Sequence, residues 1–341
     1  MAEPLITVSK PFPATQSPFT STSSFIQKLL SVSVTLSPGI AQVNALPTFA
    51  GGTSNAVTLS GHRTSARITY AGAPNTSYAT IRIWGVNQSL MNQLSTLGMI
   101  YDSVQRNTVT VSAGTSIQGF TGIPGQLAPV FGGTAIQAYG EYDNMPDVPF
   151  VFVCQAGISD SVIAATPSSF TGVTDVATMM SGYARLMNLQ FENNGVTAKL
   201  SNPYYGGNVW QQVQQAARDA HINAEIVSGG TVLAIWPVGG SRSAANAPIP
   251  LISPQTGMIG YPGFAGNGFL VVRHIFNPLV AFGGQIQVQS SLPQANKTWT
   301  VVKLDLSLDS LVPKGEWTGV AYCQPSAFSA PVPPGTIGPP S

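Results

Sequence analysis

The sequence predicts a mostly β fold in which two β-barrels are joined by a mixed helix and strand module. Segments that alternate apolar and polar residues occur near both ends of the chain, for example LLSVSVTLS at 29–37 and TWTVVKLDLSLDS at 298–310. The 35 glycines and 27 prolines supply the turns that many short strands need. The two longest segments with helical spacing both lie in the middle of the chain.

The length of the chain indicates more than one domain. A chain of 341 residues exceeds the size at which a single hydrophobic core usually keeps growing. From the changes in pattern and the Gly/Pro-rich stretches we predict six parts: an N-terminal arm (1–24), a first β-barrel (25–147), an α+β module (148–237), a linker (238–250), a second β-barrel (251–324) and a proline-rich C-terminal tail (325–341).

Short strands interrupted by one helix are predicted for the first of the two β parts, and such strands form a barrel or a sandwich. We expect the strands in LLSVSVTLS, ARITYA, ATIRIWGV, NTVTVSAG and TAIQAYGEY, which are rich in β-branched residues. The helix is expected in QSLMNQLSTLG, where Leu90, Met91, Leu94 and Leu97 form one apolar stripe. Gly98 is a suitable stop, because glycine readily adopts the left-handed conformation at a helix C-terminus.

The middle module is predicted to begin with a strand and to continue with two helices. VPFVFVCQAGI at 148–158 is apolar at almost every position, which predicts a strand buried on both faces. The helices are expected to start after Thr174 and after Asn208, the candidate N-caps, because apolar residues follow both at helical spacing. VTAKLS and TVLAIWP are predicted as further strands.

The stretch HIFNPLVAFGGQIQVQSS, residues 274–291, indicates how the second barrel turns. Asn277-Pro278 predicts a change of direction, because proline fixes φ and restricts the residue before it. Gly283-Gly284 supplies the backbone freedom for a second bend. Beyond this bend the residues alternate, so one face of the strand is apolar and the other carries three glutamines: Gln285, Gln287 and Gln289.

The surface is expected to be polar but nearly uncharged. With 14 basic and 13 acidic residues, 8% of the chain is charged, against about 25% in an ordinary soluble domain. Free monomers usually keep apart through charge, so this composition favours surfaces that partners cover. The net charge of +1 argues against a dedicated nucleic-acid binder. We expect a soluble chain made in the cytoplasm, without a signal peptide or a membrane-spanning segment.

No catalytic, metal or cofactor site is predicted. His62, His221 and His274 are too far apart for a local metal motif, and no phosphate-binding or dinucleotide-binding motif occurs, so we expect no cofactor. Cys154 and Cys323 lie in apolar strand contexts and are expected to be reduced and buried.

Two pairs of acidic residues are candidates for glycoside hydrolysis, which needs two carboxylates about 5 to 9 Å apart. Asp143 and Asp147 lie in a proline-containing turn, where aspartate is common. Asp305 and Asp309 lie on the polar face of one predicted strand. We expect both pairs to be structural.

An ordered series of segments gives the chain a family resemblance. The C-terminal third contributes SPQTGMIGYPGF, FNPLVAFGGQIQVQSSLPQAN, TWTVVKLDLSLDSLVPKGEW and WTGVAYC, which begins with Trp317. Earlier segments are VTLSGHRTSARITYAGAP, ATIRIWGVNQSLMNQLSTLG and, in the middle module, FENNGVTAKLSNPYYGG. Together they resemble the baseplate hub proteins of contractile-tailed bacteriophages, which are related to the hub portion of type VI secretion spike proteins. The order of the segments across 25–323, not a single motif, carries this resemblance.

The resemblance implies two hub-type β-barrels per chain and a homotrimer on the tail axis. The resulting ring has pseudo-sixfold symmetry, adapts the sixfold tail tube to the threefold central spike, and lets DNA pass through its lumen. The implied partners are the chain itself, the tail tube protein, the spike protein, neighbouring baseplate proteins and the tape measure protein. The implied location is the virion, after assembly in the host cytoplasm. Because the functional surfaces of this family are broad interfaces, the resemblance implies no enzyme and no catalytic residue.

The resemblance also implies roles for the turns of the second barrel. Asn277-Pro278 and Gly283-Gly284 are expected at corners where a strand bends on the tube-facing surface. Four more corner residues are expected at the entrance of the barrel: Pro254, Gly257, Gly260 and Pro262. An interface with a neighbouring subunit or with the tube is expected at or beside the three glutamines: Gln285, Gln287 and Gln289.

Two other functions stay open from the sequence. A tail-tip hydrolase of cell-wall peptidoglycan would use Asp143, Asp147 or another acidic residue. A receptor-binding tail protein would lie at the periphery of the particle and bind sugars or other surface groups. Lysis of purified cell walls and the position of the chain in the particle distinguish both from a structural hub.

Overall fold

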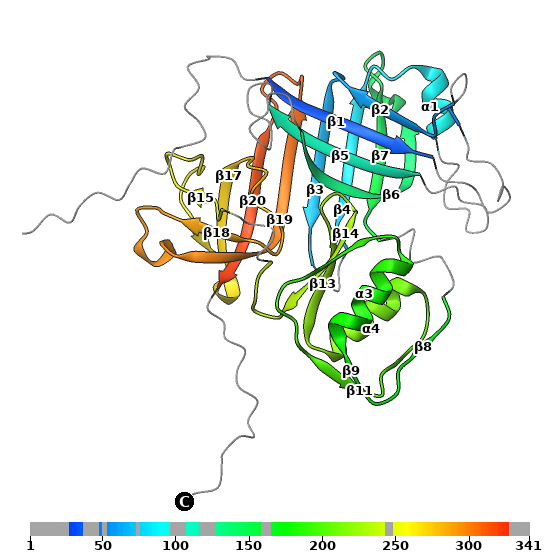
Figure 1. Cartoon of the computed structure of the whole chain (residues 1–341). Coiled ribbons are helices and arrows are strands. Elements are labelled where there is room, and N and C mark those ends of the chain that lie inside the picture. The colour runs from blue at the N-terminus through cyan, green and yellow to red at the C-terminus, as the bar shows by residue number, and fades with distance from the viewer. Residues whose placement is uncertain are drawn as a thin grey trace, which may run out of the picture.

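The computed structural model describes the chain in eight ranges: 27–36, 48–49, 53–72, 76–95, 107–115, 127–157, 165–242 and 248–326. The predicted N-terminal arm, Leu97, Gly98 and all but the first two residues of the predicted tail lie outside them. A large sheet forms one part of the molecule, and a smaller module with helices α3 and α4 packs below it in the view of Figure 1. None of the helices in the described ranges could span a bilayer.

One 13-stranded sheet contains the strands of both predicted barrels (Figure 1). The first half of the chain contributes β1 (Lys28–Thr35), β2 (Ala56–Ser60), β3 (Thr64–Tyr70), β4 (Tyr78–Trp84), β5 (Thr108–Thr115), β6 (Ala128–Gly140) and β7 (Pro149–Gln155). The last part contributes β15 (Leu251–Ile252), β16 (Gly263–Phe264), β17 (Leu270–Ile275), β18 (Gln285–Val288), β19 (Thr298–Ser310) and β20 (Trp317–Pro325). The order is β16-β17-β20-β19-β3-β4-β7-β6-β5-β1-β2, with β18 also paired to β19 and β15 to β18.

The long strand β19 joins the two halves of the sheet. It pairs antiparallel with β20 on one edge and with β3 on the other, so Leu306 lies between Gly319 and Ile68. At its end, the Ser310 hydroxyl donates a 2.8 Å hydrogen bond to the carbonyl oxygen of Lys28 in β1. In the described ranges no ladder joins β1 to β19. The predicted class, mostly β with an α+β module, is confirmed, but the described strands form one continuous sheet in which no closed barrel is found.

The segment 251–259 lies between β18 and β17. Its first residues form β15, which pairs in parallel with β18. Its last residues meet β17, where Met258 forms a bridge with His274 and the Ile275 amide donates a 2.7 Å bond to the carbonyl oxygen of Gly257. Buried side chains from this part and from the first half belong to the same hydrophobic core. This shared core is the physical reason why the two predicted barrels are not separate units.

The α+β module has its own hydrophobic core between two helices and a small sheet. Helices α3 (Val176–Leu186) and α4 (Val209–Asp219) contact a three-stranded sheet of β10 (Gln190–Asn193), β14 (Val232–Pro237) and β13 (Ile222–Val227). Two further pairs are formed by β9 (Val173–Asp175) with β11 (Lys199–Ser201) and by β8 (Ser168–Ser169) with β12 (Tyr204–Tyr205). Strands β10 and β13 were not expected from the sequence.

Helix starts follow local side-chain chemistry. Asn208 caps α4, as predicted, and forms a capping box with Gln211. The N-cap of α3 is Asp175, not Thr174, because the Asp175 carboxylate accepts a 2.9 Å bond from the Thr178 amide. Helix α1 (Gln88–Leu94) lies in the predicted segment. Three short 3₁₀ helices complete the described structure: η1 (Tyr142–Asn144), η2 (Gly266–Gly268) and η3 (Pro293–Ala295).

Strand β7 differs from the predicted domain division. We placed the start of the α+β module at Val148, but β7 pairs with β4 and β6 in the large sheet. It is buried on both faces, as predicted, with Phe150, Val151 and Phe152 fully inaccessible. An uninterrupted apolar run fits any covered strand, so the pattern could not tell to which sheet this strand belongs.

Candidate functional site

The α+β module contacts the large sheet through glycine backbones. Gly132 in β6 faces the turn Gly229–Gly230 between β13 and β14. A Cβ atom at Gly132 would lie 1.8 Å from the carbonyl oxygen of Gly229, so this position accepts no side chain. The two backbones therefore determine how closely the module approaches the sheet.

Three aromatic rings from distant parts of the chain pack together at this junction. Tyr70 in β3 stacks on Phe282, with ring centroids 6.1 Å apart, and Trp236 in β14 makes an edge-on contact with Phe282 at 5.8 Å. The Tyr70 hydroxyl donates to the carbonyl oxygen of Val130 in β6. Burial raises the pKa of Tyr70, so the hydroxyl keeps the proton that it donates. The cluster links the large sheet, the α+β module and the segment before β18.

A buried ion pair lies beside these rings. Arg242, whose side chain is 5% exposed, donates bonds of 2.9 Å from Nε and from Nη2 to the two carboxylate oxygens of Glu192. Its backbone amide also donates a 2.7 Å bond to the carbonyl oxygen of Gly283. Burial raises the pKa of Glu192, but the hydrogen bonds from Arg242 and Asn194 outweigh this and hold the pKa below its usual value. The predicted linker 238–250 therefore contains an anchoring residue.

A second carboxyl group at the junction, that of Glu225, accepts a hydrogen bond from a hydroxyl group and has, within the described ranges, no arginine partner like that of Glu192. Glu225 in β13 is 3% exposed, and the hydroxyl of Ser77, just before β4, donates a 3.0 Å bond to it. Burial raises the pKa of Glu225 to about 7, and the Ser77 bond offsets only part of this effect. The protonation of this side chain therefore changes near neutral pH.

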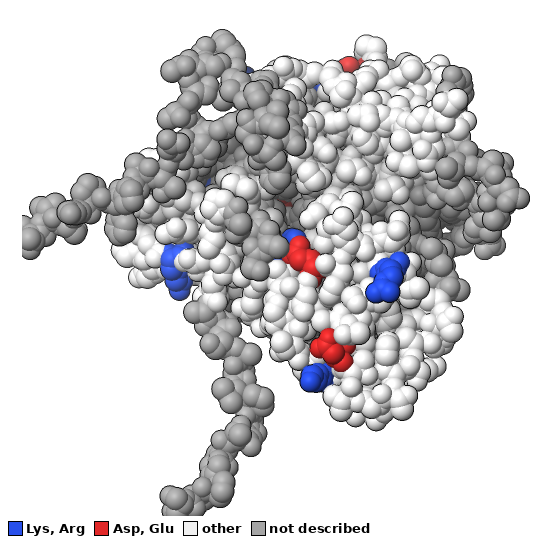
Figure 2. All heavy atoms as spheres, in the orientation of Figure 1, with Lys and Arg blue, Asp and Glu red and all other residues white. Residues whose placement is uncertain are grey.

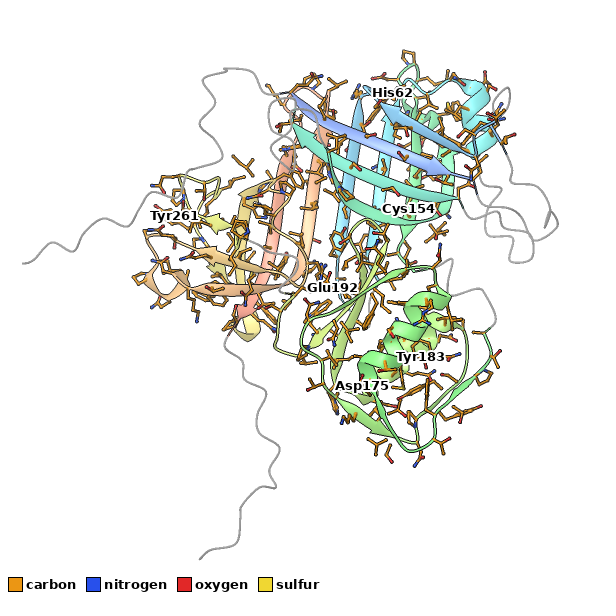
Figure 3. The ribbon with its side chains drawn as sticks, viewed as in Figure 1. His62, Cys154, Asp175, Tyr183, Glu192 and Tyr261 are labelled. Atoms are coloured by element: carbon orange, nitrogen blue, oxygen red, sulfur yellow. The ribbon has the colours of Figure 1, made fainter. Side chains whose placement is uncertain are left out.

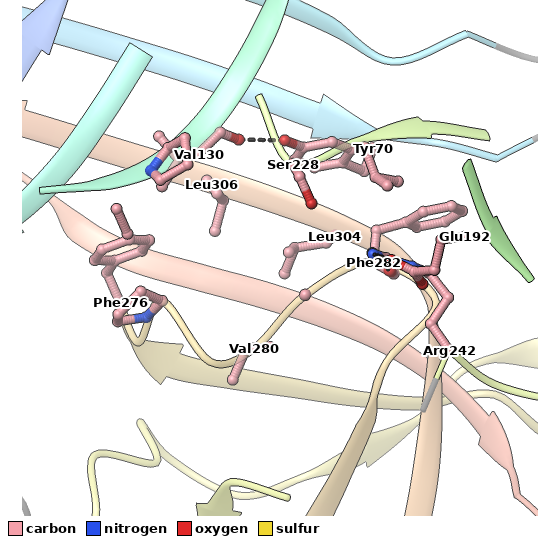
Figure 4. A pocket seen from close by; sticks show the side chains of 15 residues that line it. Tyr70, Val130, Glu192, Ser228, Arg242, Phe276, Val280, Phe282, Leu304 and Leu306 are labelled. Atoms are coloured by element: carbon pink, nitrogen blue, oxygen red, sulfur yellow. Dashed lines mark hydrogen bonds and ion pairs between the residues drawn. The ribbon is translucent and has the colours of Figure 1, made fainter. Parts of the chain in front are cut away.

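A cavity of about 270 Å³ lies at the same junction (Figure 4). Arg242 and Glu192 lie together at one end of it, and Phe276 lies at the other (Figure 4). Its other walls are mostly apolar, and include Val280, Leu304 and Leu306. Such a cavity suits a largely apolar group with one polar end.

The predicted turns occur where the sequence placed them. The Asn277 side chain accepts a 3.0 Å bond from the Leu279 amide, and its carbonyl oxygen accepts one of 3.0 Å from the Val280 amide. Gly283 has a φ of +75°, which glycine adopts without strain. A Cβ atom there would lie 3.0 Å from both Arg242 and Trp236. The bend at Gly283-Gly284 thus also serves the contact with the α+β module, which we did not foresee.

The other predicted positions of the last part are turn or core residues. Gly257 and Gly260 have φ values of +106° and +71°. Pro254 is exposed and Pro262 is buried. Trp317 is buried and packs edge-on against Phe276, with centroids 5.4 Å apart. Their place on a tube-facing surface stays a prediction.

Strand β18 alternates as predicted. Ile286 and Val288 are buried in the core, Gln285 is half-buried, and Gln287 and Gln289 are exposed. The backbone of the strand is paired on both sides, with β15 and β19. Only the glutamine side chains are therefore presented outward, and their role as an interface stays a prediction.

The acidic pairs are engaged in structural contacts. Asp309 accepts 2.7 Å bonds from Ser65 and Arg67, and Asp305 accepts one of 2.9 Å from Thr69. Burial raises the pKa of Asp309, but the bonds from Arg67 and Ser65 outweigh it, so its pKa lies below the usual value. A glycosidase acid needs the opposite shift.

The turn carboxylates are equally ordinary. Asp147 forms a 2.7 Å ion pair with Arg63, and both side chains are substantially exposed. Asp143 lies in η1 and is exposed. Both carboxylates are open to solvent, whereas the general acid of a glycosidase lies in an enclosed, apolar environment.

The histidines and cysteines take up separate positions. In the described ranges no three His, Cys, Asp or Glu side chains form a group that could hold a metal ion. His62 lies 3.1 Å from the carbonyl oxygen of Trp84, and burial lowers the pKa of His274. Cys154 and Cys323 are both buried and free, as predicted, and burial raises the pKa of both thiols.

Charged side chains are sparse on the surface. Figure 2 shows one face of the molecule, on which the few basic and acidic side chains are separated by wide uncharged areas. Several of the charges are paired within the chain, such as Arg82 with Glu141 and Lys303 with Asp305. Such a surface suits contact with other protein chains more than binding of phosphate.

A family model described as baseplate hub gp41 matches residues 47–314. The chain belongs to this family. The matched range includes the strands of the large sheet from β2 to β19 and the whole α+β module, and it leaves out β1 and β20. The predicted resemblance to phage baseplate hub proteins is thus confirmed. No curated protein matches the sequence.

Solved structures of tail proteins have the fold of this hub family member. The prophage MuSo2 43 kDa tail protein of Shewanella oneidensis has a TM-score of 0.55 at 10% identity, with 88% of this chain and 97% of that chain covered. A tail protein of Neisseria meningitidis has a TM-score of 0.54 at 9% identity, with 87% and 96% covered. The Escherichia coli c3393 protein, a type VI secretion component similar in structure to the T4 tail proteins gp27 and gp5, has a TM-score of 0.51 at 9% identity, with 77% and 73% covered. These similarities concern the fold.

The residues of the junction are hard to recognise in the sequence of this hub protein. Arg242 lies in a stretch rich in glycine, serine and alanine, which predicts a linker. Glu225 interrupts the apolar segment INAEIV, and a charged residue inside an apolar run is the one signal that could have been used. Tyr70, Trp236 and Phe282 look like ordinary strand or turn residues until the fold brings them together.

Proposed function

We propose that three copies of the chain form a ring on the tail axis that adapts the sixfold tail tube to the threefold central spike. The observation that carries this proposal is the match to the baseplate hub gp41 family over residues 47–314. The sheet supports it, because β19 fixes two sheet halves relative to each other in one chain. Three chains then present six such halves, which agrees with the pseudo-sixfold symmetry of the ring.

The ring encloses a lumen for the passage of DNA, and its outer surfaces contact the tube, the spike and neighbouring baseplate proteins. The low charge of the chain supports this role, because a dense basic lining would hold the phosphates of the DNA. We assign Gln287 and Gln289 to a contact with a neighbouring subunit or the tube. Gln287 is exposed on β18, whose backbone pairs with β15 and β19, and Gln289 is exposed directly after this strand.

The decisive experiment is a density map of the assembled tail with this chain placed in it. Three copies on the axis, between the tube and the spike, would support the proposal. Six or more copies at the periphery would support a receptor-binding protein instead. Analytical ultracentrifugation of the purified chain gives a first answer, because a closed ring of three predicts a trimer with large buried interfaces.

We also propose that the chain is not a hydrolase. The support is that Asp147 and Asp309 are paired with arginines and that, although burial raises the pKa of Asp309, the hydrogen bonds from Arg67 and Ser65 hold it low. The purified chain should leave a suspension of cell walls turbid. Clearing that is lost in Asp143→Asn or Asp147→Asn would contradict this.

A further inference from the structure

The junction cavity has one end that suits an oxygen atom. Arg242 lies at this end and makes two short bonds to Glu192, but Nη1 has only a long one, 3.4 Å, to the carbonyl oxygen of Phe282. A guanidinium carries five N–H donors, so these bonds leave it able to donate to one more acceptor. The remaining walls are mostly apolar side chains, although Tyr70 and Ser228 also line the cavity. The cavity therefore matches an aromatic ring that ends in an oxygen, which is the chemistry of tyrosine.

The same chain presents such a side chain on another part of its surface. Tyr261, in the segment before β16, is 81% exposed, the most of any large hydrophobic residue in the described ranges. Phe264, three residues further along the chain, is 50% exposed and packs against the ring of Trp299. Figure 3 shows Tyr261 at the outer end of the C-terminal part of the large sheet, well away from Glu192. Tyr261 therefore cannot occupy the cavity of its own chain.

We propose that Tyr261 of one copy inserts into the junction cavity of the next copy in the ring. The inference rests on the proposed function, because a closed ring of three identical chains needs a heterologous contact between two different patches of each chain. The exposed tyrosine and the cavity are two such patches. No charge opposes their contact, because Arg242 is already neutralised by Glu192 and the phenol is uncharged.

The consequence reaches beyond subunit association. The inserted ring would contact Arg242 and Val280, on the two sides of the site where the α+β module meets the sheet. Each subunit would thus fix the module orientation of its neighbour. Assembly of the ring and ordering of the junction then become one event.

The test mixes two variants that each lack one patch. Tyr261→Ala removes the inserted ring, and Ala281→Trp narrows the cavity from its half-exposed wall. Each change should weaken ring association by at least about 30-fold in the dissociation constant, as expected for a central tyrosine contact. Mixed together, the two proteins retain one intact tyrosine and one intact cavity, so heterodimers should form that neither variant forms alone. Tyr204→Ala, which alters a 67% exposed tyrosine of the α+β module, is the matched control and should leave association unchanged.

The outcomes separate the two proposals. A wild-type chain that is monomeric at every concentration would overturn the ring and this contact together. A wild-type trimer that is unaffected by Tyr261→Ala would overturn the contact alone, as would a mixture without heterodimers. Thermal unfolding of each variant checks that it is folded. A photoreactive phenylalanine at position 261 of the otherwise unchanged chain gives an independent answer. It should crosslink to residues that line the cavity of a second copy, such as Arg242 and Val280, and a crosslink to residues outside the cavity would contradict the proposal.

Discussion

Glu225 makes the stability of the junction depend on pH. The carboxyl group is 3% exposed and has an ordinary pKa of 4.5 in an unfolded chain, which burial raises to about 7 in the folded protein. Between these values the unfolded chain has lost the proton and the folded chain still holds it. The folded state therefore binds more protons, and the free energy of unfolding falls as the pH rises from 4.5 to 7. The pKa difference corresponds to a total loss of roughly 3 kcal/mol.

Glu225→Gln tests this account, because glutamine keeps an acceptor oxygen for Ser77 and cannot ionise. Near pH 4.5 the variant and the wild type should be about equally stable. At pH 8 the variant should be more stable by roughly 3 kcal/mol, because it avoids a buried carboxylate. Urea denaturation at several pH values, followed by tryptophan fluorescence, measures both quantities.

A second variant identifies the group responsible. Ser77→Ala removes the hydrogen bond that lowers the pKa of Glu225, so the loss of stability should extend to higher pH than in the wild type. Parallel pH profiles for the wild type and Glu225→Gln between pH 5 and 8 would refute the reasoning.

Three further substitutions test the packing described above. Gly132→Ala should destabilise the chain by about 3 kcal/mol or more in thermal unfolding, because its methyl group would collide with the backbone at Gly229. The control is Gly182→Ala in α3, where open space surrounds the glycine; this change should stabilise the chain by about 0.5–1 kcal/mol. Equal changes in stability for the two variants would contradict the close contact at Gly132. Arg242→Met should lower the free energy of unfolding by about 3 kcal/mol because Glu192 loses its partner, and adding Glu192→Gln in the same chain should recover part of this loss. If the double variant instead loses the sum of what the two single variants lose, the two residues are not a coupled pair. Asn208→Ala should cost about 1 kcal/mol in urea denaturation, and no change would mean that the cap is not formed in solution.

Local patterns predicted the elements whose causes are local. The alternation of β18 follows from a period of two, and the start of α4 follows from the short reach of the Asn208 side chain. The start of α3 was one residue off because Thr174 and Asp175 are both good caps, and only the geometry chooses between them. Strand β13 was missed because Glu225 breaks its apolar run.

Long-range pairing could not be predicted in the same way. Nothing in TWTVVKLDLSLDS indicates that its second half pairs with β3, more than 200 residues earlier in the chain, as well as with β20. The junction depends on this pairing, because Tyr70, one of its aromatic residues, is the last residue of β3. A prediction of the ion pair between Arg242 and Glu192 would have required the same three-dimensional knowledge.

The double pairing of β19 has a mechanical consequence. Residues Leu304–Leu308 are bonded to a neighbour on both edges, so the two sheet halves cannot tilt apart without breaking a whole row of peptide hydrogen bonds together. A force applied along the strands is shared by all of these hydrogen bonds at once, so they resist shear together. The two halves of the sheet should accordingly move as one rigid unit, so that a displacement of one half displaces the other.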